Sequence, residues 1–142
     1  MKKTRLTAVY DFDFELIGIV STVKEYKLAW NLNQLNLFHL VKADDIKIDF
    51  TENRQIHISN LIYEDDFTLV HLLRNKLVPS NNGANQYLIQ ELSRFDYLLK
   101  VKNLTEDGWA EKIYEQIRDL NFADYVTKIE LDRIKHKENL LF

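Results

Sequence analysis

FDYLLKV, residues 95–101, has an echo near the start of the chain in FDFELIGIV, residues 12–20. Both stretches begin with an aromatic residue, an aspartate and a second aromatic residue, and both continue with apolar residues typical of a buried strand. A threonine follows each aspartate by nine residues, at Thr22 and Thr105, and we expect each threonine to cap a helix. The sequence therefore predicts a strand–helix–strand unit at each end of the chain.

The first helix is expected to run from Thr22 to about Asn36, because Thr22 and Glu25 have the spacing of a capping box. Its apolar residues form two stripes. One stripe contains Tyr26 and Trp30, and leucines form the other stripe on a different side. A helix that is apolar on two sides packs against more than one partner, for example the sheet and a second helix or another subunit. Tyr26 and Trp30 are therefore candidate interface residues.

Between the two units the pattern changes to short β-type segments separated by turn residues. These segments are LFHLV (37–41), IKIDF (46–50), QIHISNLIY (55–63) and FTLVHLL (67–73). We predict a single α+β domain over residues 1–142, with an antiparallel sheet of about five to seven strands, extended by a meander, and two helices on one face. This is a ferredoxin-like βαβ…βαβ plan. It makes the two aromatic–Asp–aromatic strands antiparallel neighbours, which places Asp13 and Asp96 at opposite ends of the sheet.

The composition excludes several classes of function. The 142 residues include no cysteine, so disulfides and thiol catalysis are excluded, and the three glycines are isolated, so a glycine-rich phosphate loop is excluded. A formal charge of −3 argues against general binding of nucleic acids or anionic membranes. No signal peptide or membrane span is recognisable. We therefore expect a cytoplasmic protein without a cofactor.

The stretch that precedes the second strand, IQELSR (89–94), holds the candidate catalytic residues. Glu91 and Asp96 are candidates for a general acid–base pair. The structural alternative is that Glu91 pairs with Arg94 or a nearby lysine, and that Asp96 accepts hydrogen bonds from main-chain amides at the start of the strand. This alternative is favoured because an acid–base site with perturbed carboxylates needs a cleft, and the sequence does not show one.

The four histidines are the other chemically active side chains. They are His39, His57, His71 and His136. None of them has the short spacing to another histidine that places two imidazoles on one metal ion, so no metal site is expected.

The chain ends in Leu140, Leu141 and Phe142. Leaving these side chains in water would cost about 1.5–3 kcal/mol each. The C-terminus is therefore expected to pack against its own domain or to insert into a partner subunit.

IQELSRFDY, residues 89–97, resembles the motif of the IPExxxVDY family of bacterial proteins. The matching residues are Ile89, Glu91, Asp96 and Tyr97. Gln90 replaces the proline of the family motif, and Phe95 replaces its valine. The resemblance extends to DFDFELIGI near the start and KENLLF at the end. It implies a bacterial cytoplasmic protein and supplies no established activity.

Three hypotheses of function follow. The first is a non-catalytic protein-interaction module that forms a homodimer through Tyr26, Trp30 and the apolar C-terminus. The second is a regulatory domain that binds a small metabolite near Trp30, Tyr97 or Trp109. The third is an enzyme that uses Glu91 and Asp96, and if the motif acts beyond folding, Glu91 is the residue expected to carry that role.

Overall fold

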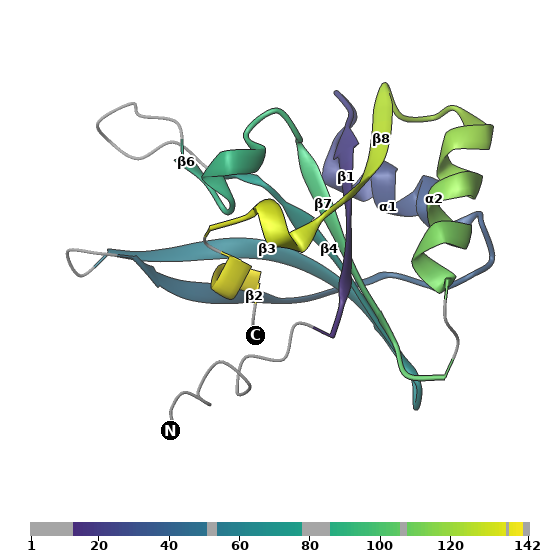
Figure 1. Cartoon of the computed structure of the whole chain (residues 1–142), viewed down its shortest axis with the longest axis horizontal. Coiled ribbons are helices and arrows are strands. Elements are labelled where there is room, and N and C mark those ends of the chain that lie inside the picture. The colour runs from purple at the N-terminus through teal and green to yellow at the C-terminus, as the bar shows by residue number, and fades with distance from the viewer. Residues whose placement is uncertain (1–12, 51–53, 78–85, 106–107, 136, 141–142) are drawn as a thin grey trace.

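The computed structural model describes residues 13–50, 54–77, 86–105, 108–135 and 137–140 (Figure 1). These residues form an α+β structure around one six-stranded antiparallel sheet, in the order β2–β3–β4–β7–β1–β8. The strands are β1 (Glu15–Val20), β2 (Val41–Phe50), β3 (Arg54–Glu64), β4 (Thr68–Arg74), β7 (Tyr97–Asn103) and β8 (Tyr125–Ile129). The helices are α1 (Glu25–Asn33) and α2 (Trp109–Leu120). A short ribbon of β5 (Lys76–Leu77) and β6 (Gln86–Tyr87) stands apart from the sheet.

Strand β1 lies inside the sheet, between β7 and β8, and runs antiparallel to both. In its pairing with β7, Glu15 is opposite Val101 and Ile19 is opposite Tyr97. Asp13 and Asp96 therefore lie beyond opposite ends of the paired segment, as the sequence predicted. Asp13 forms an ion pair with Lys102, with 2.8 Å between Oδ2 and Nζ.

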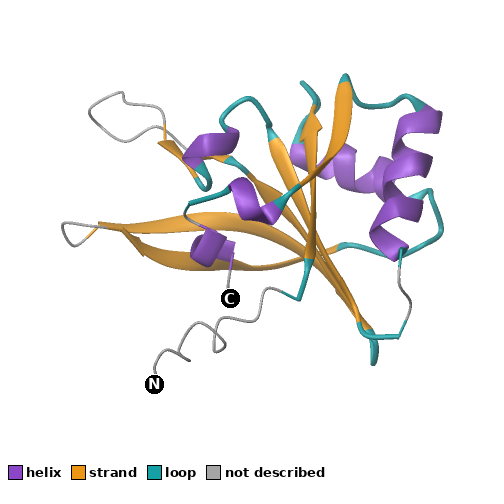
Figure 2. Ribbon diagram, viewed as in Figure 1, coloured by secondary structure: helices purple, strands orange, loops and turns teal. Residues whose placement is uncertain are grey.

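The two faces of the sheet have separate hydrophobic cores, because successive side chains of a strand point to opposite sides. Ile17 and Ile19 of β1 belong to the core under α1 and α2, and both helices cover this face (Figure 2). Leu16 belongs to the other core, which contains the fully buried Phe95. Three short 3-10 helices lie on or near this second face: η2 (Gln90–Leu92), η3 (Leu131–Arg133) and η4 (Lys137–Leu140).

Both predicted helix caps are wrong. The N-cap of α1 is Lys24, which makes no side-chain capping bond, and Thr22 is exposed in the preceding turn. The N-cap of α2 is Gly108, whose φ of 78° lies in the left-handed region that glycine adopts without strain. Thr105 instead bonds Asn103 through its main-chain amide. Long-range contacts of the turn before α1, described below, determine where that helix begins.

The segment between α1 and β3 also differs from the prediction. Residues 37–40 are not in a strand, and β2 is one continuous strand from Val41 to Phe50. The acidic pair Asp44–Asp45, expected to form a turn, lies instead at an irregularity in the pairing between Ala43 and Ile46. A bulge accommodates extra residues without ending a strand. The two turn-forming aspartates therefore do not mark the end of a strand, as the sequence had suggested.

Candidate functional site

The segment that carries the motif, residues 88–96, wraps around the side chain of Asn75. This segment is called the motif loop below. Asn75 is fully buried, and its Nδ2 donates to the main-chain carbonyls of Leu92 at 2.8 Å and Phe95 at 3.1 Å. Its Oδ1 accepts a hydrogen bond of 2.9 Å from the amide of Ile89. Because one amide side chain satisfies three main-chain groups of the loop, Asn75 fixes its conformation.

Asp96 and Tyr97, the last two motif residues, hold the turn between β1 and α1. Asp96 Oδ2 accepts a hydrogen bond of 2.9 Å from the amide of Ser21. The Tyr97 hydroxyl donates to the carbonyl of Val23 at 2.7 Å. Burial raises the pKa of Tyr97, and the positive charge of Arg74 only partly opposes that effect. The hydroxyl therefore stays protonated and keeps donating at neutral pH.

A cleft of about 640 Å³ opens beside these two residues. Residues 21–26 line one part of it, and Arg74, Lys76, Asp96 and Tyr97 line the rest. Arg74 is the cross-strand neighbour of Tyr97 in the pairing of β4 with β7. Within the described part of the chain, neither Arg74 nor Lys76 forms an ion pair or a side-chain hydrogen bond. The cleft therefore combines the motif with cations that have no anionic partner among the described residues.

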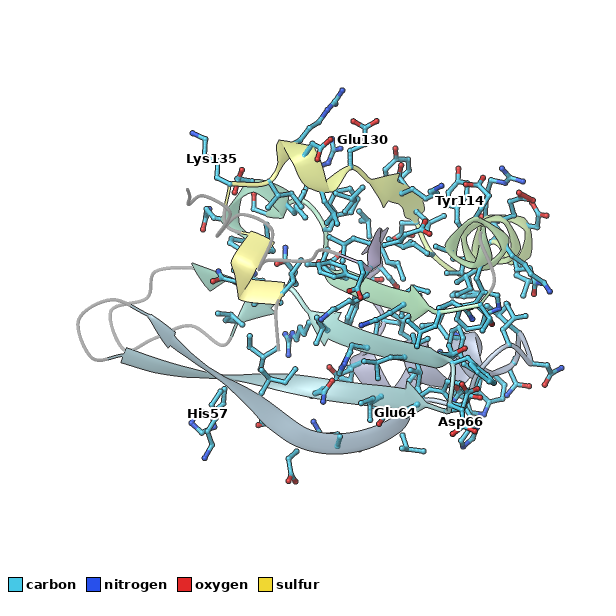
Figure 3. All side chains as sticks on the ribbon, turned by 60° about the horizontal axis from the view of Figure 1, so that its bottom comes forward. His57, Glu64, Asp66, Tyr114, Glu130 and Lys135 are labelled. Atoms are coloured by element: carbon cyan, nitrogen blue, oxygen red, sulfur yellow. The ribbon has the colours of Figure 1, made fainter. Side chains whose placement is uncertain are left out.

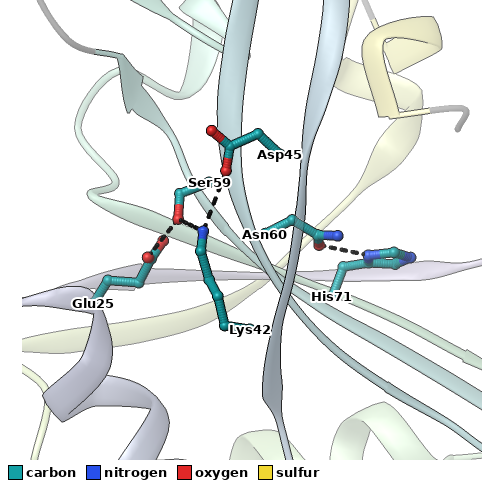
Figure 4. Close-up of polar contacts among 6 residues, drawn as sticks. All are labelled: Glu25, Lys42, Asp45, Ser59, Asn60 and His71. Atoms are coloured by element: carbon teal, nitrogen blue, oxygen red, sulfur yellow. Dashed lines mark hydrogen bonds and ion pairs between the residues drawn. The ribbon is translucent and has the colours of Figure 1, made fainter.

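A chain of polar contacts ties the start of α1 to strands β2 and β3 (Figure 4). The Ser59 hydroxyl donates to Glu25 Oε1 at 2.6 Å, and Lys42 Nζ donates to Ser59 Oγ at 2.6 Å. Lys42 also pairs with Asp45, at 3.2 Å. Glu25 lines the cleft, so these contacts fix one of its walls to the outer strands.

Glu91 lies outside the cleft and contacts the C-terminal part of the chain. Both of its carboxylate oxygens accept hydrogen bonds from the amide of Lys135, at 3.0 Å and 2.8 Å. Its side chain is exposed, whereas Asp96 is half-buried and lines the cleft. The cleft thus contains one carboxylate of the proposed acid–base pair and lacks the other. In this position Glu91 holds the segment that leads to η4.

The C-terminal segment packs back on its own domain at Leu140, which is fully buried in the core that contains Phe95. The carbonyl of Leu140 accepts a hydrogen bond from the ammonium group of Lys100. Leu141 and Phe142, the other predicted interface residues of this segment, lie outside the described residues.

Tyr26 and Trp30, called the aromatic pair of α1 below, are exposed, with 72% and 62% of their surfaces accessible. They lie one helical turn apart, and Tyr26 also lines the cleft. Trp109 has a different environment. It is buried in the core under the helices, where its ring makes an edge-on contact with Phe38 at 6.1 Å between centroids. Of the aromatic residues proposed for ligand contact, Tyr97 is in the cleft, Trp30 is accessible, and Trp109 is in the core.

A buried polar row crosses the face of the sheet opposite the helices. His71 and Lys100 are cross-strand neighbours, and His71 Nδ1 lies 2.9 Å from Asn60 Oδ1 (Figure 4). Burial, with the nearby charge of Lys100, lowers the pKa of His71 to about 4. Burial, with the charge of Lys102, lowers the pKa of Lys100 to about 8. At neutral pH His71 is therefore neutral and Lys100 remains largely charged.

The other described histidines are separate from this row. His39 is in the segment before β2, and His57 is on β3, where its side chain projects into solvent (Figure 3). His136 is outside the described residues. Within the described ranges, no three His, Asp or Glu side chains gather closely enough to hold a metal ion.

Neither a protein-family model nor a curated protein sequence matches the chain. In the described part of the chain, neither helix has the length and apolar character needed to cross a bilayer.

Sequence reasoning missed the residues that organise the site. The polar stretch consists of Arg74 at the end of β4, Asn75 between the strands and Lys76 at the start of β5, and in the sequence it indicates a turn and nothing more. The partners of Asn75 lie 14 to 20 residues further along the chain, so no local pattern marks it. A buried asparagine is recognised only once the main-chain groups around it are placed.

Proposed function

We propose that this protein is a non-catalytic binding module, and that it docks a segment of a partner protein on the surface at the start of α1. This surface consists of the cleft and the aromatic pair of α1. The observation that carries the proposal is the position of the exposed Tyr26, which lines a cleft whose other residues include Arg74 and Lys76. Aromatic side chains and arginine are enriched at protein-binding surfaces.

A protein segment fits this surface better than an enclosed metabolite does. Sites for small molecules are mostly apolar and enclose most of the ligand surface. This cleft is lined mainly by polar and charged residues, and its cations are exposed. The aromatic pair extends the contact surface beyond the cleft, which suits an extended peptide. A small metabolite is the second candidate, favoured only by the volume of the cleft.

We also propose that the protein self-associates through the aromatic pair of α1. The small exposed area of this pair limits the affinity of such a dimer. At 72% and 62% accessible, Tyr26 and Trp30 offer on the order of 250–300 Å² of exposed surface. A standard interface buries about 800 Å² on each partner. A homodimer formed through α1 alone is therefore weak and depends on concentration. Light scattering at increasing protein concentration tests it, and a constant monomer mass contradicts it.

Binding of a peptide is tested by selection from a displayed random-peptide library on the wild-type protein. Selected peptides are expected to bind at least about tenfold more weakly to the variant Tyr26→Ser/Trp30→Ser. The matched control is Leu120→Ser/Tyr125→Ser, which removes two other exposed apolar side chains, 58% and 52% accessible. The proposal is contradicted if the selected peptides bind equally well to the wild type and to Tyr26→Ser/Trp30→Ser. It is also contradicted if the selection enriches no peptide.

We also propose that the fold follows a ferredoxin-like plan and that the chain belongs to the IPExxxVDY family. The position of β1 between β7 and β8, with α2 connecting β7 to β8, supports a ferredoxin-like plan in which β2 and β3 extend the sheet. Structural roles for Glu91, Asp96 and Tyr97 support membership of the IPExxxVDY family of bacterial cytoplasmic proteins. A solved structure of a recognised family member tests both, since it should share the strand order and the contacts of these three residues.

A further inference from the structure

The cleft has an excess of positive charge that no described residue neutralises. Its charged lining consists of three cations and two carboxylates. Asp96 accepts a hydrogen bond from the amide of Ser21, and Oε1 of Glu25 accepts one from the hydroxyl of Ser59, whereas Oε2 of Glu25 is buried without a hydrogen-bond partner among the described residues. Within the described part of the chain, Arg74 and Lys76 have no such partner. These two cations are therefore available to an anion that enters the cleft.

The start of α1 adds to this preference. The helix begins at the wall of the cleft, and Lys24 at its N-cap makes no side-chain capping bond. The first main-chain amides of the helix thus lack the side-chain acceptor that usually satisfies them. The helix dipole also favours a negative charge at this end. A carboxylate in the cleft would meet a guanidinium group, an ammonium group and the helix start together.

The charge balance of the cleft selects the type of anion. Three cations against two carboxylates leave one positive charge. A single carboxylate matches that charge, whereas a phosphate monoester carries about −1.5 to −2. Arg74 also offers the planar donor pair that binds a carboxylate through two hydrogen bonds.

We infer that the cleft anchors an acidic side chain of the docked peptide, through Arg74 and Lys76, while an apolar neighbour of that side chain packs on Tyr26. This inference rests on the proposed function and names the residue type that the site recognises. The acidic residue supplies the charge-assisted hydrogen bonds, and its apolar neighbour covers the exposed ring. Binding is therefore expected to weaken as salt concentration rises.

The test uses blocked pentapeptides and the full chain. The probes are acetyl-Ala-Phe-Glu-Phe-Ala-amide, its glutamine counterpart, its phosphoserine counterpart and free butyrate, which carries a single carboxylate. Binding is followed by the NMR amide signals of residues 21–26 and 96–97. The glutamate peptide is expected to bind about tenfold more tightly than the glutamine peptide. In the variant Arg74→Gln/Lys76→Gln this ratio should fall to about one. In the control Lys47→Gln/Lys112→Gln, which removes two exposed lysines outside the cleft, the ratio should be unchanged.

The outcomes separate the inference from the proposed function. If the glutamate and glutamine peptides bind equally well at these signals, the carboxylate anchor is wrong and the peptide-binding module stands. If the phosphoserine peptide binds most tightly, the cleft is a phosphate site and the inference is overturned. If butyrate binds as tightly as the glutamate peptide, the carboxylate anchor stands and the proposed function is wrong, because the peptide contributes nothing. If no probe shifts these signals, both are wrong.

Discussion

The side chain of Asn75 offers the sharpest test of how the motif loop is held. The substitution Asn75→Ala removes three hydrogen bonds, to the amide of Ile89 and the carbonyls of Leu92 and Phe95. Each such bond contributes about 0.5–1.5 kcal/mol, and buried groups left without a partner add to the loss. We expect the free energy of unfolding to fall by about 3–4 kcal/mol, which is a large part of the typical 5–15 kcal/mol.

The substitution Asn75→Asp separates hydrogen bonding from volume. Aspartate has nearly the same shape and keeps an acceptor for the amide of Ile89, but it loses both donations and places a charge where Asn75 is fully buried. We therefore expect it to destabilise the protein at neutral pH at least as much as alanine does. If packing alone mattered, aspartate would be nearly neutral.

Urea unfolding followed by tryptophan fluorescence measures both effects, and hydrogen exchange locates them. Amides of residues 88–96 should lose protection in the Asn75 variants before the rest of the sheet does. The matched control is Asn60→Ala, because Asn60 is also buried and makes one side-chain bond, to His71. If Asn75→Ala costs no more than Asn60→Ala, the idea that Asn75 organises the loop is refuted.

Three further predictions concern other contacts of the fold. Gly18→Ala places a Cβ 2.6 Å from Ile129 Cδ1 and 2.7 Å from Phe95 Cδ1, so it should cost about 1–3 kcal/mol, and the part due to the ring should disappear in a Phe95→Leu background. The folded-state pKa of His71, about 4, lies below its usual 6.5. The unfolded chain therefore binds the proton first, so stability falls as the pH drops from about 6.5 to 4, by up to about 3 kcal/mol, and His71→Gln should remove this component of an unfolding pH series. Glu91→Gln should weaken its two contacts with the chain at residue 135, lowering stability by about 1–2 kcal/mol and speeding amide exchange over residues 131–135.

Each of these three predictions has a control in the chain. Gly108→Ala is strained by its φ of 78° and has open space around the new Cβ, so its cost should not depend on Phe95. His57→Gln changes an exposed histidine and should leave the pH dependence intact. Glu115→Gln removes an exposed carboxylate of α2 and should not alter exchange near Glu91. If a control matches the effect of its variant, the corresponding contact is not the cause.

The inner strands were predictable from the sequence because strands that are buried on both faces read as short continuous apolar runs. In the structure Ile17 and Ile19 of β1 face the helices, and Leu16 faces the other core. The pairing of β1 with β7 followed from the repeated aromatic–Asp–aromatic triplet. The start of α1 was not predictable from a capping rule, since hydrogen bonds from residues more than 70 positions away fix the preceding turn.

The candidate site was predictable only in part. Sequence reasoning selected Asp96 and Tyr97, which line the cleft, and Glu91, which contacts the C-terminal segment instead. It could not find Arg74 and Lys76, because they lie about twenty residues before Asp96 and Tyr97. Arg74 comes beside Tyr97 only through the pairing of β4 with β7, and Lys76 follows two residues later. Cations on a surface are also common, and only the position of neighbouring anions shows which of them lack a partner.

The central position of β1 has a consequence for synthesis on the ribosome. Strand β1 emerges before the other strands of this sheet, but it pairs only with β7 and β8, which the ribosome makes after those other strands. Strands β2, β3 and β4 pair with their neighbours in the sequence, so they can associate while β1 still lacks both partners. Closure of the sheet therefore waits until residues 97–129 have left the exit tunnel. A nascent chain stalled before that point exposes the apolar residues of β1, which makes it a substrate for chaperones.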